Sequence, residues 1–218
     1  MSRKPEKHRP FYSLLDAFKE RHCPICYLAR KSVTSFLDDF LYEGINDPGM
    51  RDAIRNAGGF CEKHYWQLVS FGDPLGNAII LQDLLAVVQK TSPFGDIKAD
   101  KKVGGECPAC QIFEDSEKRY SNVFVENFEY PELRSGFQNS CGLCLGHFAS
   151  IIKFLNKEQQ AWLLAVEKQK LDALVDELSE FKEKFNYKRS AEGFGADRDV
   201  WIRAVEFLKG RSDRLGEN

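Results

Sequence analysis

The chain has 218 residues, of which 43% are hydrophobic, enough for one sizeable core or two small ones. Its 31 basic and 33 acidic residues leave a formal net charge of −2, which argues against a nucleic-acid partner. No stretch approaches the ~18 consecutive apolar residues of a membrane helix, and the polar segment 1–10 lacks the apolar core of a signal peptide. We therefore expect a cytoplasmic protein with no membrane partner.

Apolar residues at helical spacing predict helices throughout the first half of the chain. Pro48 suits the first turn of a short helix, which Gly58 and Gly59 end. The segment 91–105 contains a proline, three glycines and several lysines, and we interpret it as a linker. The helices predicted before it are 11–21, 27–42, the short helix after Pro48, 60–71 and 77–90.

The second half predicts a similar series that ends in two further helices. A segment over 112–128 and a short helix after Pro131 precede a long helix over 156–186 and a last helix over 197–209. In the long helix, Leu164, Leu171 and Leu174 belong to a stripe with largely 3-4 spacing, which favours a core stripe in a helical bundle over a dimeric coiled coil. Because no period-2 strand appears, the predicted fold class is all-α.

Cysteine and histidine recur in two kinds of motif. Cys23-Pro24-Ile25-Cys26 is followed after 34 residues by Cys61-Glu62-Lys63-His64. Cys107-Pro108-Ala109-Cys110 is followed after 33 residues by Cys144-Leu145-Gly146-His147. Seven cysteines in a cytoplasmic protein favour metal or redox chemistry over structural disulfides.

The two motif sets belong to an internal repeat with an offset of 84 residues at CPxC and 83 at CxxH. Pro48 and Pro131 match in the same register, and so do Gly59 and Gly142. We therefore predict a first repeat over 1–90, a linker over 91–105, and a second repeat with the long and final helices over 106–218. In this register Cys141 aligns with Gly58, so it is a spare thiol outside the ligand set.

The motifs suit zinc, which takes four thiolate or imidazole ligands in a tetrahedron. We predict one Cys₃His site in each repeat: Cys23, Cys26, Cys61 and His64 in the first, and Cys107, Cys110, Cys144 and His147 in the second. Four protein ligands leave no open position for water, so both sites should be structural. An iron–sulfur centre is the alternative, although clusters usually prefer four cysteines.

The sequence contains no recognisable catalytic motif. It therefore does not favour an enzyme, and we leave enzymatic activity open. We predict a protein-interaction or regulatory module that binds another protein. Two alternatives remain. One is a redox- or zinc-responsive switch, in which a Cys141–Cys144 disulfide would release zinc; the other is an iron–sulfur electron carrier or enzyme.

The arrangement resembles a family of uncharacterised, mostly prokaryotic helical proteins with paired CPxC and CxxH motifs. The eight proposed ligands carry the resemblance, together with the tryptophan-bearing segment from Val200 to Leu208. It implies metal binding and no assigned activity. Zinc anti-sigma factors are a looser likeness: their HxxxCxxC pattern needs a histidine four residues before Cys23, where this chain has Lys19.

Overall fold

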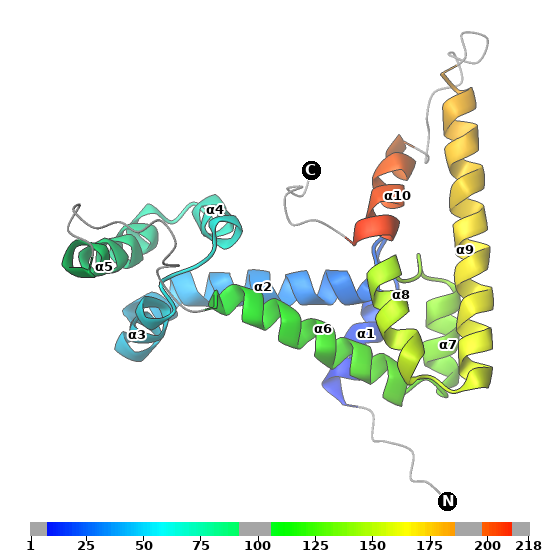
Figure 1. Ribbon diagram of the computed structural model, residues 1–218, viewed down its shortest axis with the longest axis horizontal. Coiled ribbons are helices and arrows are strands. Elements are labelled where there is room, and N and C mark those ends of the chain that lie inside the picture. Colours follow the sequence, from blue (N-terminus) through cyan, green and yellow to red (C-terminus); the bar gives the residue numbers. More distant parts are fainter. Residues whose placement is uncertain (1–7, 92–105, 186–197, 211–218) are drawn as a thin grey trace, which may run out of the picture. The chain divides into compact units, whose positions relative to one another are not determined.

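The computed structural model describes residues 8–91, 106–185 and 198–210, and in these ranges it is helical without strands (Figure 1). The all-α prediction is confirmed. The helices are α1 (Arg9–Ala17), α2 (Pro24–Tyr42), η1 (Gly44–Asn46), α3 (Pro48–Asn56), α4 (Glu62–Ser70), α5 (Pro74–Thr91), α6 (Pro108–Glu126), α7 (Pro131–Gln138), α8 (Leu145–Ile151), η2 (Ile152–Phe154), α9 (Lys157–Glu183) and α10 (Val200–Lys209).

Proline marks where several helices begin. The α2, α3, α5, α6 and α7 helices each have proline as their first residue. Proline fixes φ near the helical value, and its missing N–H has no partner to lose in the first turn. The long α9 helix starts differently, with a capping box in which Asn156 and Gln159 each bond the other's backbone.

The chain divides into two compact units. The terminal unit comprises the described residues up to Leu28 and from Glu117 onward, and the middle unit comprises Ala29–Ser116. These units have other bounds than the predicted repeats over 1–90 and 106–218, because α2 and α6 each contribute their first and last parts to different units. Apart from Thr91, the predicted linker lies outside the described residues.

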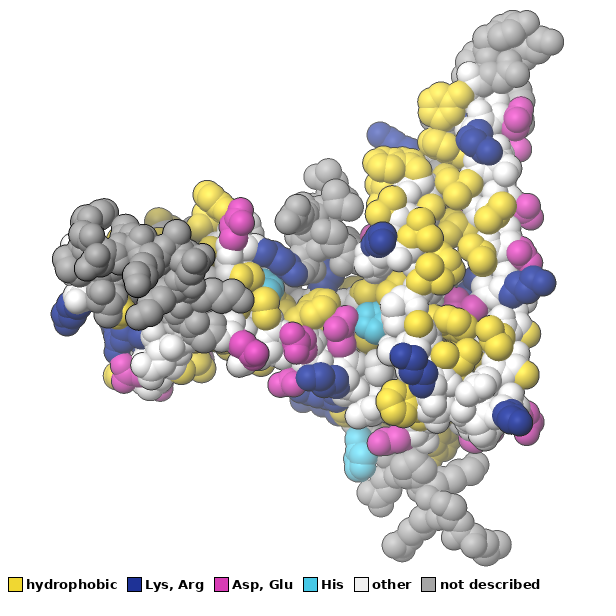
Figure 2. All heavy atoms as spheres, viewed as in Figure 1, with side chains coloured by type: hydrophobic (Ala, Val, Ile, Leu, Met, Phe, Trp, Pro, Cys, Tyr) yellow, Lys and Arg dark blue, Asp and Glu magenta, His cyan; other side chains and the backbone are white. Residues whose placement is uncertain are grey.

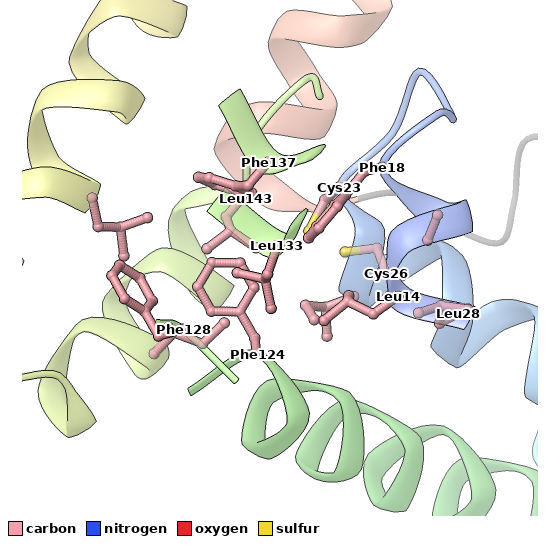
Figure 3. Packing of buried hydrophobic residues seen from close by; sticks show 14 of the residues in the cluster. Leu14, Phe18, Cys23, Cys26, Leu28, Phe124, Phe128, Leu133, Phe137 and Leu143 are labelled. Atoms are coloured by element: carbon pink, nitrogen blue, oxygen red, sulfur yellow. The ribbon is translucent and has the colours of Figure 1, made fainter. Parts of the chain in front are cut away.

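The core of the terminal unit is rich in aromatic rings (Figure 3). Phe124 lies at its centre, with ring centroids 5.1 Å from Phe137, 5.8 Å from Phe128 and 6.4 Å from Phe18. Trp162 of α9 packs edge-on against Phe128. In this unit α1 packs on α7, and α10 contacts both α8 and α9.

The core of the middle unit is smaller. Phe60 packs edge-on against the rings of Phe36, Phe40 and Tyr65. The α3 and α4 helices both contact α5. Buried aliphatic side chains complete the cluster: Val33, Leu37, Leu41, Ile45, Ile54, Leu68 and Ile80.

The face that α9 buries differs from the one predicted. Leu163, Val166 and Glu167 are its buried residues, whereas Leu164 is 50% exposed and Leu171 is 39% exposed. The prediction of a core stripe was wrong for these two leucines. In a helix, adjacent residues such as Leu163 and Leu164 point about 100° apart, so a one-residue shift of the stripe changes which face is buried. None of the described helices is long and apolar enough to cross a membrane.

Candidate metal centres

Each cysteine pair or cysteine–histidine pair lies at the N-terminus of a helix. Cys61 and Cys144 are the N-cap residues of α4 and α8, and His64 and His147 are the third residues of these helices. Cys23 and Cys107 likewise precede the first residues of α2 and α6, with the second cysteine at the third helical position. The N-cap and third residues lie on the same side of a helix. Two ligand residues with two residues between them can therefore direct their ligand atoms at one point.

Four ligands meet in the terminal unit and form what we call the terminal site: Cys23, Cys26, Cys144 and His147. All four are buried. His147 Nδ1 lies 3.1 Å from Cys144 Sγ, 3.4 Å from Cys26 Sγ and 3.5 Å from Cys23 Sγ. The two cysteines at the start of α2 lie beside the aromatic core, as Figure 3 shows for Cys23, Cys26 and Phe18.

The other four ligands meet in the middle unit and form the middle site: Cys61, His64, Cys107 and Cys110. His64 is buried, whereas its three cysteines are partly exposed. His64 Nδ1 lies 3.2 Å from Cys61 Sγ, 3.4 Å from Cys107 Sγ and 3.5 Å from Cys110 Sγ.

The pairing of motifs is therefore exchanged relative to the predicted repeats. Each site joins the CPxC of one repeat to the CxxH of the other, and the prediction of one site within each repeat was wrong. All eight predicted residues still belong to a ligand group. The α2 helix has 19 residues, so its ends lie about 27 Å apart at 1.5 Å per residue. This helix carries the chain away from Cys23 and Cys26 before Cys61 and His64 are reached, which favours the exchanged pairing.

The separations within each site are close to the edges of a tetrahedron around one ion. Metal bonds of about 2.3 Å to sulfur and 2.0–2.1 Å to nitrogen give edges of about 3.8 Å for S···S and 3.6 Å for S···N. Cys26 Sγ lies 3.8 Å from Cys144 Sγ, and Cys61 Sγ lies 3.7 Å from Cys110 Sγ. The shortest S···N separations are 3.1 Å in the terminal site and 3.2 Å in the middle site, so both groups could hold a metal ion after small shifts of their ligand atoms.

The pKa values of several candidate ligands differ from those of the same side chains in water. Burial lowers the pKa of His64 to about 4, so its imidazole is neutral and its Nδ1 can bind a metal at neutral pH. Hydrogen bonds from Cys23 and Cys26 lower the pKa of Cys144 well below its ordinary value, while burial raises the pKa of Cys23. The thiols thus share protons that a metal ion would displace.

Two residues outside the ligand sets lie close to the terminal site. His22 Nδ1 is 2.8 Å from Glu206 Oε2, which ties the segment before Cys23 to α10. Glu167 Oε1 accepts a hydrogen bond of 2.7 Å from Leu143 N, next to Cys144. Nothing in the sequence patterns singled out Glu167, except that it interrupts the apolar stripe of α9.

Cys141, the predicted spare thiol, is in neither ligand group. The residue is exposed, and its Sγ lies 3.6 Å from Gly142 O. Although part of the residue is exposed, desolvation of its thiol raises its pKa to about 12. The group is therefore a thiol rather than a thiolate at neutral pH, which makes it a poor nucleophile.

The fold and ligand groups describe a helical protein with two candidate metal centres. A family described as "Family of unknown function (DUF6062)" matches the chain over residues 12–103 and 89–214, and the chain belongs to this family. An "Uncharacterized 23.9 kDa protein in xynA 3'region" of Caldicellulosiruptor sp. (strain Rt8B.4) is 33% identical over 206 residues, covering 90% of this chain and 99% of that protein. No solved structure matches the chain.

Proposed function

We propose that the protein binds two zinc ions at structural Cys₃His sites and acts as a module that binds another protein. The observation that carries the zinc assignment is the tetrahedral spacing of both ligand groups. Three thiolates and one imidazole are a typical ligand set for structural zinc.

The same spacing argues against an iron–sulfur cluster. A cluster places several iron and sulfide ions between its ligands, so the cysteine sulfurs must lie farther apart than the edge of a single-ion tetrahedron. In both sites the closest cysteine sulfurs are under 4 Å apart. One imidazole in each group also departs from the four cysteines that clusters usually use.

The ligand count supports a structural role for the metal. A catalytic zinc keeps a position open for water, whereas each group here supplies four protein ligands. The sites also join segments that are distant in sequence: Cys26 and Cys144 are 118 residues apart, and Cys61 and Cys110 are 49 apart. Closing such loops costs entropy that metal binding would offset.

Exposed apolar side chains on the terminal unit support a protein partner. Figure 2 shows them gathered over α9 and α10. On α10 they recur at helical spacing as Trp201, Val205 and Leu208, each more than half exposed. A groove of about 420 Å³ lies beside α9 and is lined almost entirely by apolar atoms, with Leu145, Phe148, Leu164, Leu171 and Phe207 among its residues. Such surfaces typically bind proteins.

A reducing compartment such as the cytoplasm fits the proposal. All seven cysteines are free of disulfides, and two complete thiolate sites would be at risk of oxidation elsewhere. The redox-switch alternative has less support, because sensor cysteines have a lowered pKa whereas that of Cys141 is raised.

Elemental analysis of the protein purified anaerobically tests the metal assignment. We expect two zinc ions per chain and negligible iron. A coloured, iron-containing preparation would overturn the proposal in favour of electron transfer or redox sensing.

The interaction proposal needs a separate test. Cross-linking and affinity capture with the unmodified chain should recover a reproducible partner, and Leu171→Glu should reduce its recovery because it places a charge in the apolar groove. Trp66→Ala is a control, since Trp66 is exposed in the middle unit. Capture that is absent, or equally strong with Leu171→Glu, would count against this surface.

A further inference from the structure

The two histidine ligands differ in what holds the ring nitrogen that points away from the cysteines. His147 Nε2 lies 2.9 Å from Glu117 Oε1, a carboxylate on α6. His64 Nε2 is buried, and no described residue gives it a hydrogen-bond partner. A carboxylate on the second nitrogen fixes the orientation of a histidine ligand and increases its basicity, so the terminal site has a support that the middle site lacks.

The repeat register gives this difference an origin in the sequence. Glu117 lies 84 residues after Val33, which is the offset between the two CPxC motifs. Val33 is buried on α2 in the core of the middle unit. The first repeat therefore has an aliphatic side chain at the position where the second has the carboxylate.

The charged side chains near the two sites also favour metal retention at the terminal site over the middle site. In the middle site, Lys63 lies between Cys61 and His64 in the sequence, and its positive charge acts on Cys61, Cys107 and Cys110. Its Nζ is 5.4 Å from the Phe113 ring centroid. The corresponding residue of the second repeat is Gly146. A nearby cation opposes the binding of a divalent cation, whereas the Glu117 carboxylate favours it.

Solvent access differs as well. The four terminal ligands are buried, and Gly210 at the end of α10 lies against them: a Cβ at Gly210 would be 3.3 Å from Cys26 Sγ and 3.6 Å from Cys144 Sγ. In the middle site the three cysteines are partly exposed. A chelator or a competing thiol can approach these sulfurs directly.

We propose that the middle site is the exchangeable metal site of this protein, and that the terminal site retains its ion with Glu117 acting as a positioning residue on His147. The proposal rests on the proposed zinc function. It adds regulation: when free zinc falls, the middle site empties first and the middle unit loses its cross-link while the terminal unit stays closed.

The test is zinc release from the two-zinc protein into a colorimetric chelator, followed over time. We expect two phases of equal amplitude. N-ethylmaleimide added after the fast phase should modify Cys61, Cys107 and Cys110, as read by peptide mass spectrometry, and leave Cys23, Cys26 and Cys144 protected. Cys141 is outside both sites, so its labelling should not depend on which site has released zinc.

Variants of α6 test whether the Glu117–His147 contact, and not only burial of the ligands, slows zinc release from the terminal site. Glu117→Gln should accelerate the slow phase by about 10–100-fold and leave the fast phase unchanged. Glu126→Gln is the matched control, because Glu126 is exposed on the same helix and is not a ligand; it should change neither phase. Circular dichroism of each variant checks that the fold is retained.

The outcomes are distinct. A single phase, labelling of the terminal cysteines first, or a slow phase indifferent to Glu117→Gln would overturn the proposal. A starting content below two zinc ions per chain would instead contradict the proposed function on which it rests.

Discussion

The terminal and middle units each gather three cysteines and one histidine at the starts of two helices, but the surroundings of the two groups differ. In the terminal unit the ligands are buried, His147 has a carboxylate partner, and rings pack beside Cys23 and Cys26. In the middle unit the cysteines are partly exposed and His64 Nε2 lacks a described partner. The motifs thus define the candidate ligand atoms, whereas the neighbouring helices define their burial and hydrogen bonding.

The largest expected effect tests which motifs share an ion. Cys23→Ala combined with Cys144→Ala should remove one zinc ion, because both residues belong to the terminal site. Cys23→Ala combined with Cys61→Ala should remove both ions. Each structural zinc contributes on the order of 10 kcal/mol to folding of its unit, so the second pair should also unfold far more of the helix signal.

Zinc analysis and circular dichroism of the two double variants read this out, with the three single variants as controls. Each single variant should retain one ion. If Cys23 with Cys61 cost one ion and Cys23 with Cys144 cost two, the within-repeat pairing would be restored.

The second prediction compares the two cores. Phe124→Ala should lower the free energy of unfolding of the terminal unit by about 3–5 kcal/mol, because it leaves a cavity among three other rings. Phe40→Ala in the middle unit should cost less, since its described ring contact is with Phe60 alone. Denaturant unfolding of zinc-saturated protein measures both.

An exposed ring provides the control for these core variants. Phe154 is 73% exposed, so Phe154→Ala should stay within about 0.5 kcal/mol of the unmodified protein. Equal losses for Phe124→Ala and Phe154→Ala would show that the aromatic cluster does not stabilise the unit.

Much of the local structure was predictable from sequence because its signals are local. Proline at Pro48 and Pro131 marked helix starts, and the ligand spacing identified all eight residues that the structure gathers into two groups. The predicted long helix over 156–186 corresponds to α9 (Lys157–Glu183). Each of these features depends on residues that are close in sequence, so it can be predicted from the local sequence pattern.

The pairing and the supporting residues were not predictable in the same way. Two equivalent CPxC and two equivalent CxxH motifs allow two pairings, and only the path of the chain after α2 and α6 decides between them. In the sequence, Glu117 is one of several charged residues on an amphipathic helix. Only the structure shows that its carboxylate contacts His147. Contacts between residues distant in sequence therefore determine the pairing of the motifs and the partner of His147, which the motifs alone do not specify.

The third prediction concerns Glu167, a buried carboxyl in the terminal unit. Burial raises its pKa to about 7, despite the hydrogen bond from Leu143 N. The folded state then binds more protons than the unfolded state between the ordinary pKa near 4.5 and about 7. Its contribution to stability is present below the lower value and is lost as the pH rises through the upper one.

Glu167→Gln should remove this dependence while keeping an oxygen that can accept from Leu143 N. The free energy of unfolding of the variant, minus that of the unmodified protein, should increase between pH 5 and pH 8 by up to about 3 kcal/mol. Taking the difference at matched zinc occupancy cancels the pH dependence of metal binding. A difference that is flat with pH would show that the Glu167 carboxyl titrates as in solvent.

The smallest effect separates backbone strain from crowding at the terminal site. Gly210 and Gly72 have nearly the same φ, +74° and +75°. Alanine at either position should cost about 1–3 kcal/mol, because side chains disfavour a positive φ, and Gly210 with ψ 168° lies in a region that is essentially restricted to glycine. At Gly72 the added Cβ meets open space, whereas at Gly210 it lies 3.3 Å from Cys26 Sγ, closer than ordinary contact allows.

Both alanine variants should therefore be strained, but they should differ in metal behaviour. Gly210→Ala should speed zinc release from the terminal site severalfold, because the end of α10 must move away from the sulfurs or displace them. Gly72→Ala should leave both release phases unchanged. If the two variants released zinc alike, the end of α10 would not be part of what retains the terminal ion, and burial of the ligands together with Glu117 would have to account for it.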